Sequence, residues 1–456
     1  MRPAASALNF LTAVFLWLLA VTSGDLYACG LDLANGVYYR RYTQSGVTAI
    51  EARYYAHRAL PNLLVTEVAV ECDAAAPCEL HLANNAGTPS ADIAFKAVNT
   101  SSTAVTWHGF IDETEEPSSA RVEVAYTASV VPATLTVPGG TNATHYFVAA
   151  TVSSVNTTGS SLPVIASGLQ AVAVAAGPDL MASHAAAWAA LWEGGMEVGG
   201  DLGLAQAINS SLYYILSSVR SDYHWSLSPG GLASDGYNGH SFWDCETWMA
   251  PSLFAFYPAL GRSVLAYRAA HLAGAALKAQ SYSPPYDGTM FPWESAFTGE
   301  EVCPLTAPTG QYEQHITGDI VFAVRQYYDL GGFQDAAWVK AVAWPIVNGS
   351  AVFWASRVAL VDGQYVIDGV IPPDEYAVGV NNSGPCFHIV VAFGCVLHGF
   401  SVVVRYSVAL IFCSCLDLAT HEPQRRRHHH PSYSLSMRAG SQCTPTWWPS
   451  MHSSLR

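Results

Sequence analysis

Lysine is the scarcest residue of this chain, with three in 456 residues, at Lys96, Lys278 and Lys340. Acidic residues outnumber basic ones by 35 to 20, which gives a formal net charge of −15 at pH 7. Proteins that bind nucleic acids use clustered Lys and Arg to contact phosphates. The composition therefore argues against this class, and we expect no nucleic acid among the partners.

Cysteine pairs with the spacing of a metal site are also lacking in the sequence. No Cys-x-x-Cys occurs among the ten cysteines, and Cys413 and Cys415 have the wrong spacing for zinc. We therefore expect no metal and no cofactor. In the early chain only Cys72 and Cys78 are close enough to predict a local disulfide.

Near the N-terminus an apolar run covers residues 8–21, between Arg2 and the small residues 22–24. This layout predicts a signal peptide over residues 1–24, and hence a secreted or endolysosomal (vacuolar) protein. The rival interpretation is a signal anchor, but the run is shorter than a membrane span normally requires. Six Asn-x-Ser/Thr sequons agree with export and predict a glycoprotein, at Asn99, Asn142, Asn156, Asn209, Asn348 and Asn381.

The character of the chain changes after Ser383. Residues 386–415 are mostly apolar, and an Arg/His run at 425–430 and a tail without periodicity follow. One interpretation is a transmembrane anchor with a positive cytoplasmic flank. We favour translated non-coding sequence, because the run starts inside a domain, interrupts a motif and has no helical ending. We therefore treat residues 384–456 as an anomalous tail and expect no membrane anchor.

Residues 25–175 carry a strand pattern. Runs at 62–70, 121–126 and 146–152 are rich in Val, Thr and aromatic residues, and turns of Gly, Asn, Pro and Ser separate such runs. Strands at this spacing predict an N-terminal antiparallel β-sandwich domain.

Near Asp179 the pattern changes to a helical period. Residues 176–235 are assigned to a helical linker and the first helices, and residues 236–383 to an all-α domain. Helices are predicted over residues 184–192, 202–219, 249–257, 263–279, 310–330 and 333–360, the last of them broken at Pro345.

Aromatic residues are abundant, with 13 Trp and 23 Tyr. We expect most of them to pack in the core, but such rings also stack on the apolar faces of sugars. Two loops combine them with acids, at Trp243 and Asp244 and at Trp293 and Glu294. Each pair offers a stacking face beside an acceptor for hydroxyl groups. Asp244 has an alternative role as the N-cap of the following helix.

Two further loops carry titratable groups. His315 lies near the start of a predicted helix and has Glu313 and Asp319 as neighbours. A lone histidine there would more often be structural. The second loop, stiffened by prolines, carries Asp374 and Glu375.

Glu375 is the candidate proton donor. A general acid near neutral pH needs a raised pKa, from an apolar wall or a nearby like charge. We expect Asp374 and an aromatic-lined pocket to supply both. Glycoside hydrolysis normally needs two carboxyl groups flanking the bond. All four loops lie between helices, so a barrel of helical hairpins could gather them into one pocket.

In four motifs the chain resembles glycoside hydrolase family 65: Phe242-Trp243-Asp244-x-Glu246-x-Trp248, Trp293-Glu294-Ser295, His315-Ile316-x-Gly318-Asp319-Ile320 and Pro373-Asp374-Glu375-Tyr376. The resemblance covers roughly residues 25–383. This family includes acid trehalases, kojibiose and maltose phosphorylases and the glucosidase of the collagen disaccharide. The Pro-Pro-Asp-Glu-Tyr form is more similar to the collagen-type branch than to the phosphorylases.

The resemblance implies a β-sandwich of the supersandwich type, an (α/α)6 barrel, and cleavage of a terminal α-glucosidic bond with inversion. The partner would be an α-glucoside, either a disaccharide or a glucosylated glycan. Glu375 matches the family's general acid. Candidates for the glucose-binding subsite are Trp243, Asp244, Trp293, Glu294 and His315.

Two departures from the family pattern matter. Ala377 stands where a His commonly follows the Tyr. The general base of the family's hydrolases is a Glu well downstream, where this chain has only Asp417 and Glu422 as acids; in the phosphorylases, phosphate takes that role. We therefore expect residues 236–383 to form only part of the barrel. Three functions stay open: an α-glucosidase, a phosphorylase of this family, and a non-catalytic or membrane-anchored carbohydrate-binding glycoprotein.

Overall fold

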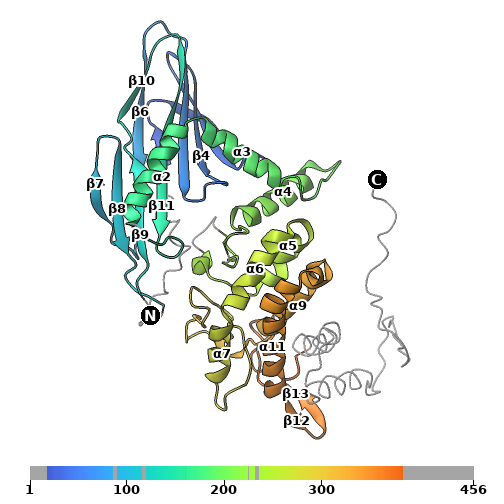
Figure 1. Cartoon of the computed structure of the whole chain (residues 1–456). Coiled ribbons are helices and arrows are strands. Elements are labelled where there is room, and N and C mark those ends of the chain that lie inside the picture. Colours follow the sequence, from blue (N-terminus) through green and yellow to red (C-terminus); the bar gives the residue numbers. More distant parts are fainter. Residues whose placement is uncertain are drawn as a thin grey trace.

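Antiparallel strands build the N-terminal part of the computed structural model, which describes residues 18–85, 90–115, 120–159, 161–223, 225–231 and 236–383. An eight-stranded sheet has the order β2-β3-β4-β5-β11-β9-β8-β7, and a three-stranded sheet has the order β1-β6-β10 (Figure 1). The predicted antiparallel β domain is therefore confirmed. Its strands are β1 (Leu18–Val21), β2 (Asp25–Asp32), β3 (Val37–Gln44), β4 (Val47–Ala56), β5 (Leu63–Cys72), β6 (Cys78–Asn85), β7 (Lys96–Thr100), β8 (Ala104–Phe110), β9 (Glu123–Ser129), β10 (Thr134–Val137) and β11 (Thr141–Ser153).

The central strand β5 is buried on both faces, and alternate side chains serve two different cores. Val68 and Val70 pack with Leu80 and Leu135 of the small sheet, so the two sheets share one apolar layer. Val65 points to the opposite side and packs with residues of the helices that follow the sheet domain. A one-residue slip of β5 would exchange these two sets, and the burial therefore fixes its register.

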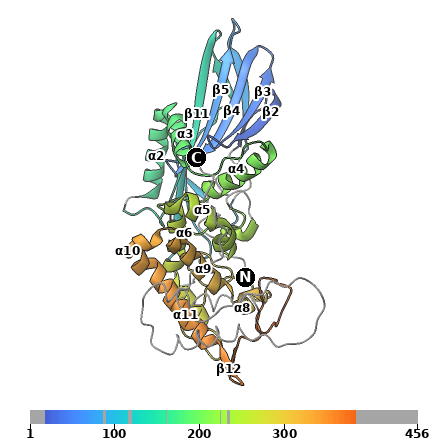
Figure 2. The same ribbon diagram turned by 90° about the vertical axis from the view of Figure 1, so that its right-hand side faces the viewer.

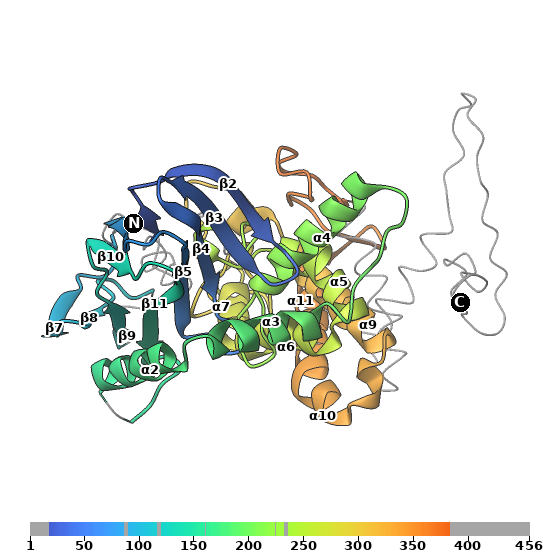
Figure 3. The ribbon, with the colours of Figure 1, turned by 90° about the horizontal axis from the view of Figure 1, so that it is seen from above.

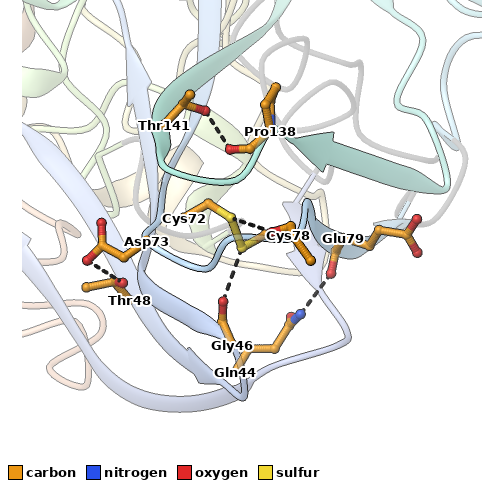
Figure 4. Close-up of a disulfide and its surroundings, with 10 residues drawn as sticks. Gln44, Gly46, Thr48, Cys72, Asp73, Cys78, Glu79, Pro138 and Thr141 are labelled. Carbon is orange, nitrogen blue, oxygen red and sulfur yellow. Dashed lines mark hydrogen bonds between the residues drawn. A yellow bond between two sulfur atoms is a disulfide. The ribbon is translucent and has the colours of Figure 1, made fainter.

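A disulfide joins the two sheets at one end. Cys72 ends β5 in the large sheet and Cys78 begins β6 in the small one, with their Cα atoms 5.9 Å apart (Figure 4). The predicted local pairing is confirmed. It closes the short connection over which the chain passes from one sheet to the other.

The strand pattern ends earlier than predicted, because residues 162–176 form helix α2 (Leu162–Ala176) and not a strand. Their Val and Ile content suits a strand, yet the buried positions recur at helical spacing and cover β8, β9 and β11 (Figures 1 and 3). Pro163 in the first turn favours a helix start there. The strand pattern expected up to residue 175 therefore ends with β11, while α2 packs on the sheet and the domain boundary at 175 stays a prediction.

Helices make up the rest of the described chain, and α6, α9 and α11 pack on one another beyond the sheet domain (Figure 2). Short turns η1 (Gly236–Gly239), η2 (Cys245–Met249), η3 (Gly332–Gln334) and η4 (Val339–Ala343) and the hairpin β12 (Ala359–Val361) and β13 (Gln364–Val366) complete it. The helices are α3 (Asp179–Leu191), α4 (Leu202–Ser217), α5 (Ala250–Phe256), α6 (Pro258–Ala270), α7 (Leu272–Gln280), α8 (Thr309–Tyr312), α9 (Ile316–Asp329), α10 (Ala336–Trp338) and α11 (Trp344–Arg357).

Three predicted helices differ from the observed ones. The helix expected over 263–279 is divided at His271 into α6 and α7. The helix expected over 310–330 is interrupted before His315, where Glu313 has an extended backbone. Pro345 does not break the last helix: α10, η4 and α11 follow one another without a non-helical residue, and the π-helical turn η4 lies directly before the proline.

The described helices form a packed helical region, and the (α/α)6 barrel stays a prediction. Within the described residues no single helix has the length and apolarity of a membrane span, although the bent pair α2 and α3 passes the same test at an angle of 94°. The predicted leader overlaps the described chain at β1, where Leu19 and Val21 are buried between the sheets. Residues 384–456, including the alternative anchor at 386–415, lie outside the described residues.

Candidate active site

A short backbone bridge brings the first two predicted loops together. Ser241 and Ser295 exchange two backbone hydrogen bonds, of 2.8 and 3.0 Å between N and O. Phe242 consequently meets Trp293 edge to face, with ring centroids 5.1 Å apart. The loops that carry Trp243 and Trp293 are therefore neighbours in space, although about 50 residues separate them in the sequence.

Next to this bridge, Glu294 bonds to His240. The distance from His240 Nδ1 to Glu294 Oε1 is 2.7 Å, and both side chains are buried. His240 Nε2 and Trp293 Nε1 are buried as well and have no hydrogen-bond partner among the described residues. Buried polar atoms normally have partners, so these two atoms are suited to bind a polar ligand such as a sugar hydroxyl.

The third predicted loop forms a buried ionic group around His315. Its Nε2 lies 2.8 Å from Glu313 Oε1, and its Nδ1 lies 2.6 Å from Asp319 Oδ2. Burial alone would lower the pKa of His315, but the bonds to Asp319 and Glu313 outweigh it and raise the pKa to about 9. The imidazole is therefore a cation at neutral pH, and both of its nitrogens donate to carboxylates.

Trp243 links this ionic group to the first loop. Its ring meets the His315 ring at 90°, with the centroids 4.9 Å apart. Phe242, the residue before Trp243, contacts Trp293. One loop therefore contacts both the loop of Trp293 and the ionic group of His315.

Glu313 is the second buried carboxyl group of the site. Burial raises its pKa, the bond from His315 opposes this, and the charges of Glu375 and Asp319 raise it further. The influence of Glu375 indicates that this carboxylate lies within electrostatic range of Glu313. Oε2 of Glu313 is buried and has no hydrogen-bond partner in the described part of the chain.

The loop of Glu375 is tied to the same region through its backbone. Ile371 N donates to Tyr312 O at 2.9 Å, next to Glu313, and Val370 pairs with Val380. The tip of the loop, with Asp374 and Glu375, is exposed.

The apolar wall expected around Glu375 is therefore absent from the described residues. Asp374 also has a different role from the one expected. Its Oδ1 accepts a hydrogen bond from Tyr376 N at 3.2 Å, which stabilises the turn.

Asp244 directly precedes the π-helical turn η2 at the start of α5. Its side chain makes no capping hydrogen bond, which contradicts the alternative role as an N-cap. The side chain is half-buried, and burial raises its pKa. Turns of this kind often occur at functional sites.

A buried ion pair stabilises the backbone at η2. Arg268 Nε and Nη2 donate to the two oxygens of Glu246, at 2.7 and 3.0 Å, and Nη2 also donates to Phe242 O at 3.2 Å. Both side chains are almost fully buried. The pair therefore fixes the backbone that carries Trp243 and Asp244.

Sequence reasoning placed Glu313 and Asp319 beside His315 but did not select them or His240 as site residues. The i, i+4 spacing of His315 and Asp319 at a helix start was a usable signal. The bond from His240 to Glu294 spans 54 residues, so no local pattern reports it. In the described part of the chain, no group of three or more His, Cys, Asp or Glu could hold a metal ion.

Comparison with known proteins agrees with this picture. Residues 209–400 match the glycosyl hydrolase family 65 central catalytic domain. The chain is 41% identical over 381 residues to protein-glucosylgalactosylhydroxylysine glucosidase of Dictyostelium discoideum, an alignment that covers 80% of this chain and 52% of that protein. It is 43% identical over 205 residues to kojibiose hydrolase of Flavobacterium johnsoniae, covering 45% of this chain and 30% of that protein.

One solved structure, a proposed kojibiose phosphorylase from the human microbiome, superposes with a TM-score of 0.70 at 16% identity, covering 88% of this chain and 57% of that one. At this identity the likeness supports the fold alone. The chain spans about half the length, or less, of the curated relatives compared here.

Proposed function

Because residues 209–400 belong to the central catalytic domain of glycosyl hydrolase family 65, we propose that this chain acts as an α-glucosidase that releases a terminal α-linked glucose. The observation that carries the proposal is the cluster of Trp243, Glu313 and the His315 cation beside the loop of Glu375. Substrates by analogy with the relatives are the glucosylated hydroxylysine glycan and kojibiose.

Each side chain has a role that its chemistry allows. Glu375 protonates the leaving oxygen as general acid, and a water molecule attacks the anomeric carbon from the opposite face, so that cleavage proceeds with inversion. The proton of this water passes to a base that is not assigned among the described residues. Trp243 and Trp293 stack on the sugar, while Asp244 and Glu294 accept bonds from hydroxyl groups. These assignments carry over from motif matches at the same positions in the sequence.

For His315 we propose an indirect role in substrate binding. Both ring nitrogens donate to carboxylates, so the ring has no further donor for a sugar. It orients Glu313 and Asp319 through its two hydrogen bonds, and the unpartnered Oε2 of Glu313 is the atom suited to a hydroxyl.

We further propose that the helices form part of an (α/α)6 barrel, and that the protein is exported and N-glycosylated. The family match supports the barrel. Export rests on the apolar N-terminal run and the sequons, four of which, at Asn99, Asn142, Asn156 and Asn381, are exposed.

Glu375→Gln is the decisive variant for the proposed chemistry. The full chain is assayed for glucose release from kojibiose, trehalose and the glucosylgalactosylhydroxylysine disaccharide. We expect the variant to lose about 100-fold to 10,000-fold in rate, the usual contribution of a general acid. Glu193→Gln, an exposed acid on the turn after α3, is the matched control and should keep full activity.

The other functions give different results in the same assay. Release of glucose 1-phosphate only when phosphate is present would identify a phosphorylase. Glucose binding without any turnover would identify a non-catalytic binding protein. Full activity of Glu375→Gln would overturn the general-acid assignment, and a product anomer equal to that of the substrate would exclude inversion.

A further inference from the structure

Lys278 is one of the three lysines of the chain, and it is buried in the helical region. Its side chain on α7 is 4% exposed, and Nζ pairs with Glu301 Oε2. Lysine is rarely buried without a partner that compensates its charge. The further contacts of Glu301 indicate what this buried ion pair does.

Glu301 binds the backbone of the two residues that we propose to contact glucose. Its Oε2 accepts from Trp293 N at 2.8 Å in addition to the lysine, and its Oε1 accepts from Glu294 N at 3.0 Å. Cys303 N adds a fourth bond at 3.2 Å. One carboxylate thus holds both Trp293 and Glu294, and Lys278 holds that carboxylate.

The loop between Glu294 and Glu301 packs closely against α7. Ser295 bridges to Glu301, and Val302 N donates to Glu294 O at 3.0 Å. A Cβ atom on Gly274 of α7 would lie 2.5 Å from Gly299 O, so only glycine lets the helix come this near.

A second carboxylate anchors the tip of this loop from the sheet domain. Glu115, in the connection between β8 and β9, accepts from Thr298 N at 3.0 Å and from its hydroxyl group. The loop is consequently held from both sides, by α7 within the helical region and by the sheet domain.

We propose that Lys278 and Glu301 are positioning residues of the glucose subsite, which hold Trp293 and Glu294 in their binding geometry before the sugar arrives. This inference rests on the proposed function. Neither residue touches the sugar in this assignment. Their effect is to remove the freedom of the loop that would otherwise oppose binding.

The variant Lys278→Met/Glu301→Gln tests this role. It removes both charges together, because either single change leaves an unpaired buried charge that endangers the fold. We expect a cooperative melting transition close to that of the unaltered chain, and a glucose affinity at least about tenfold weaker, since small misplacements of binding groups are costly. Glucose binding is measured by calorimetry on the full chain, and KM and kcat on kojibiose.

Two controls accompany this variant. Lys340→Met removes an exposed lysine of the helical region and should change neither affinity nor melting. Lys278→Arg keeps the charge and should retain most of the affinity. In the double variant we expect KM to rise while kcat changes little, which a general loss of folded protein would not produce.

Unchanged glucose affinity in the folded double variant overturns the positioning role. If that variant does not fold, Glu301→Asp decides, because it keeps the charge but draws it away from the backbone N–H groups; unchanged affinity there overturns the role as well. If the unaltered chain binds glucose but cleaves no glucoside, only the proposed function is contradicted. The glucose affinities of the variants then still test the positioning role of Lys278 and Glu301. No glucose binding by the unaltered chain overturns both.

Discussion

His315 owes its charge to its two neighbours. Hydrogen bonds to Asp319 and Glu313 raise its pKa to about 9, whereas an unfolded chain would give about 6.5. Because the folded value is the higher one, the stabilisation is complete below pH 6.5 and is lost as the pH rises through 9. The difference between the two values corresponds to about 3 kcal/mol.

Asp319→Asn tests this account. Removing one carboxylate should lower the pKa of His315 by about one unit or more, since a neighbouring opposite charge shifts a pKa by about 1 to 3 units. Histidine NMR titration of the full chain measures the value directly. Asp329→Asn, on the same helix but on the exposed pair with Arg325, is the control and should leave His315 unaffected. A pKa that stays near 9 in Asp319→Asn would contradict the ionic group.

At the scale of elements, the turn that links Trp293 to Glu301 depends on Gly299. Its φ of +77° lies in the left-handed region, and an added Cβ would collide with His271. We expect Gly299→Ala to lower the free energy of unfolding by about 2 to 4 kcal/mol, the sum of the backbone cost and overpacking.

Gly46→Ala is the matched comparison for that variant. Gly46 has almost the same φ, +79°, but open space around the Cβ position. It should therefore cost only about 1 to 2 kcal/mol, the backbone term alone. Urea denaturation of both variants measures the difference, and equal losses would show that the contact with His271 does not matter.

Local sequence pattern predicts the elements whose burial is periodic, and it fails where distant contacts decide. The buried face of α4, with Leu212 and Leu216, follows from its own spacing. Helix α2 falls in the region assigned to the β domain, because its apolar residues include Val and only the sheet beneath it selects the helical face. The interruption at Glu313 likewise depends on His315 and the buried site, not on helix propensity.

The candidate site likewise contains residues that the sequence identifies and residues that only distant contacts identify. The motif residues Trp243, Glu294 and Glu375 could be selected from the sequence, since each joins a recognisable residue type to a loop. The residues that hold these side chains in place were not selected as site residues. Glu301 lies in the same stretch of the sequence as Trp293 and Glu294, but only the folded loop brings its oxygens to the backbone of Trp293.

At the scale of the whole molecule, polar contacts join the sheet domain to the helices. Arg58, in the turn after β4, donates to the carbonyl groups of Leu216 and Val219 at the end of α4, at 2.6 and 2.8 Å. A cation at a helix C-terminus is favoured by the exposed carbonyl groups there. Arg220 returns a bond to Arg58 O at 3.4 Å.

Two buried histidines complete this junction in their neutral form. Nδ1 of His57 accepts from Leu60 N and Nδ1 of His184 accepts from Arg58 N, each at 3.0 Å. Both Nε2 atoms face carbonyl oxygens, those of Leu180 and Gly36. An Nδ1 that accepts a hydrogen bond carries no proton. Protonation of His57 therefore breaks a contact within the turn after β4, and protonation of His184 breaks one across the junction.

His184 should therefore make the molecule sensitive to acid. Burial, the neighbouring His57 and the charge of Arg58 lower its pKa to about 4 against the opposing backbone bonds, while the unfolded value is about 6.5. The unfolded chain thus binds the proton more readily, and stability is complete above pH 6.5 and falls as the pH drops towards 4, by up to about 3 kcal/mol.

His184→Asn isolates this effect, because its amide oxygen can replace Nδ1 as acceptor but does not titrate. Unfolding free energies of the variant and the unaltered chain are measured in urea between pH 7 and pH 4.5. The variant should be the less stable one at pH 7, through lost packing, and should lose less stability on acidification. His81→Gln, at an exposed position of strand β6, should leave the pH dependence unchanged. Parallel curves for His184→Asn and the unaltered chain would mean that folding does not change the pKa of this histidine, which would contradict the neutral form assigned from its bond from Arg58 N.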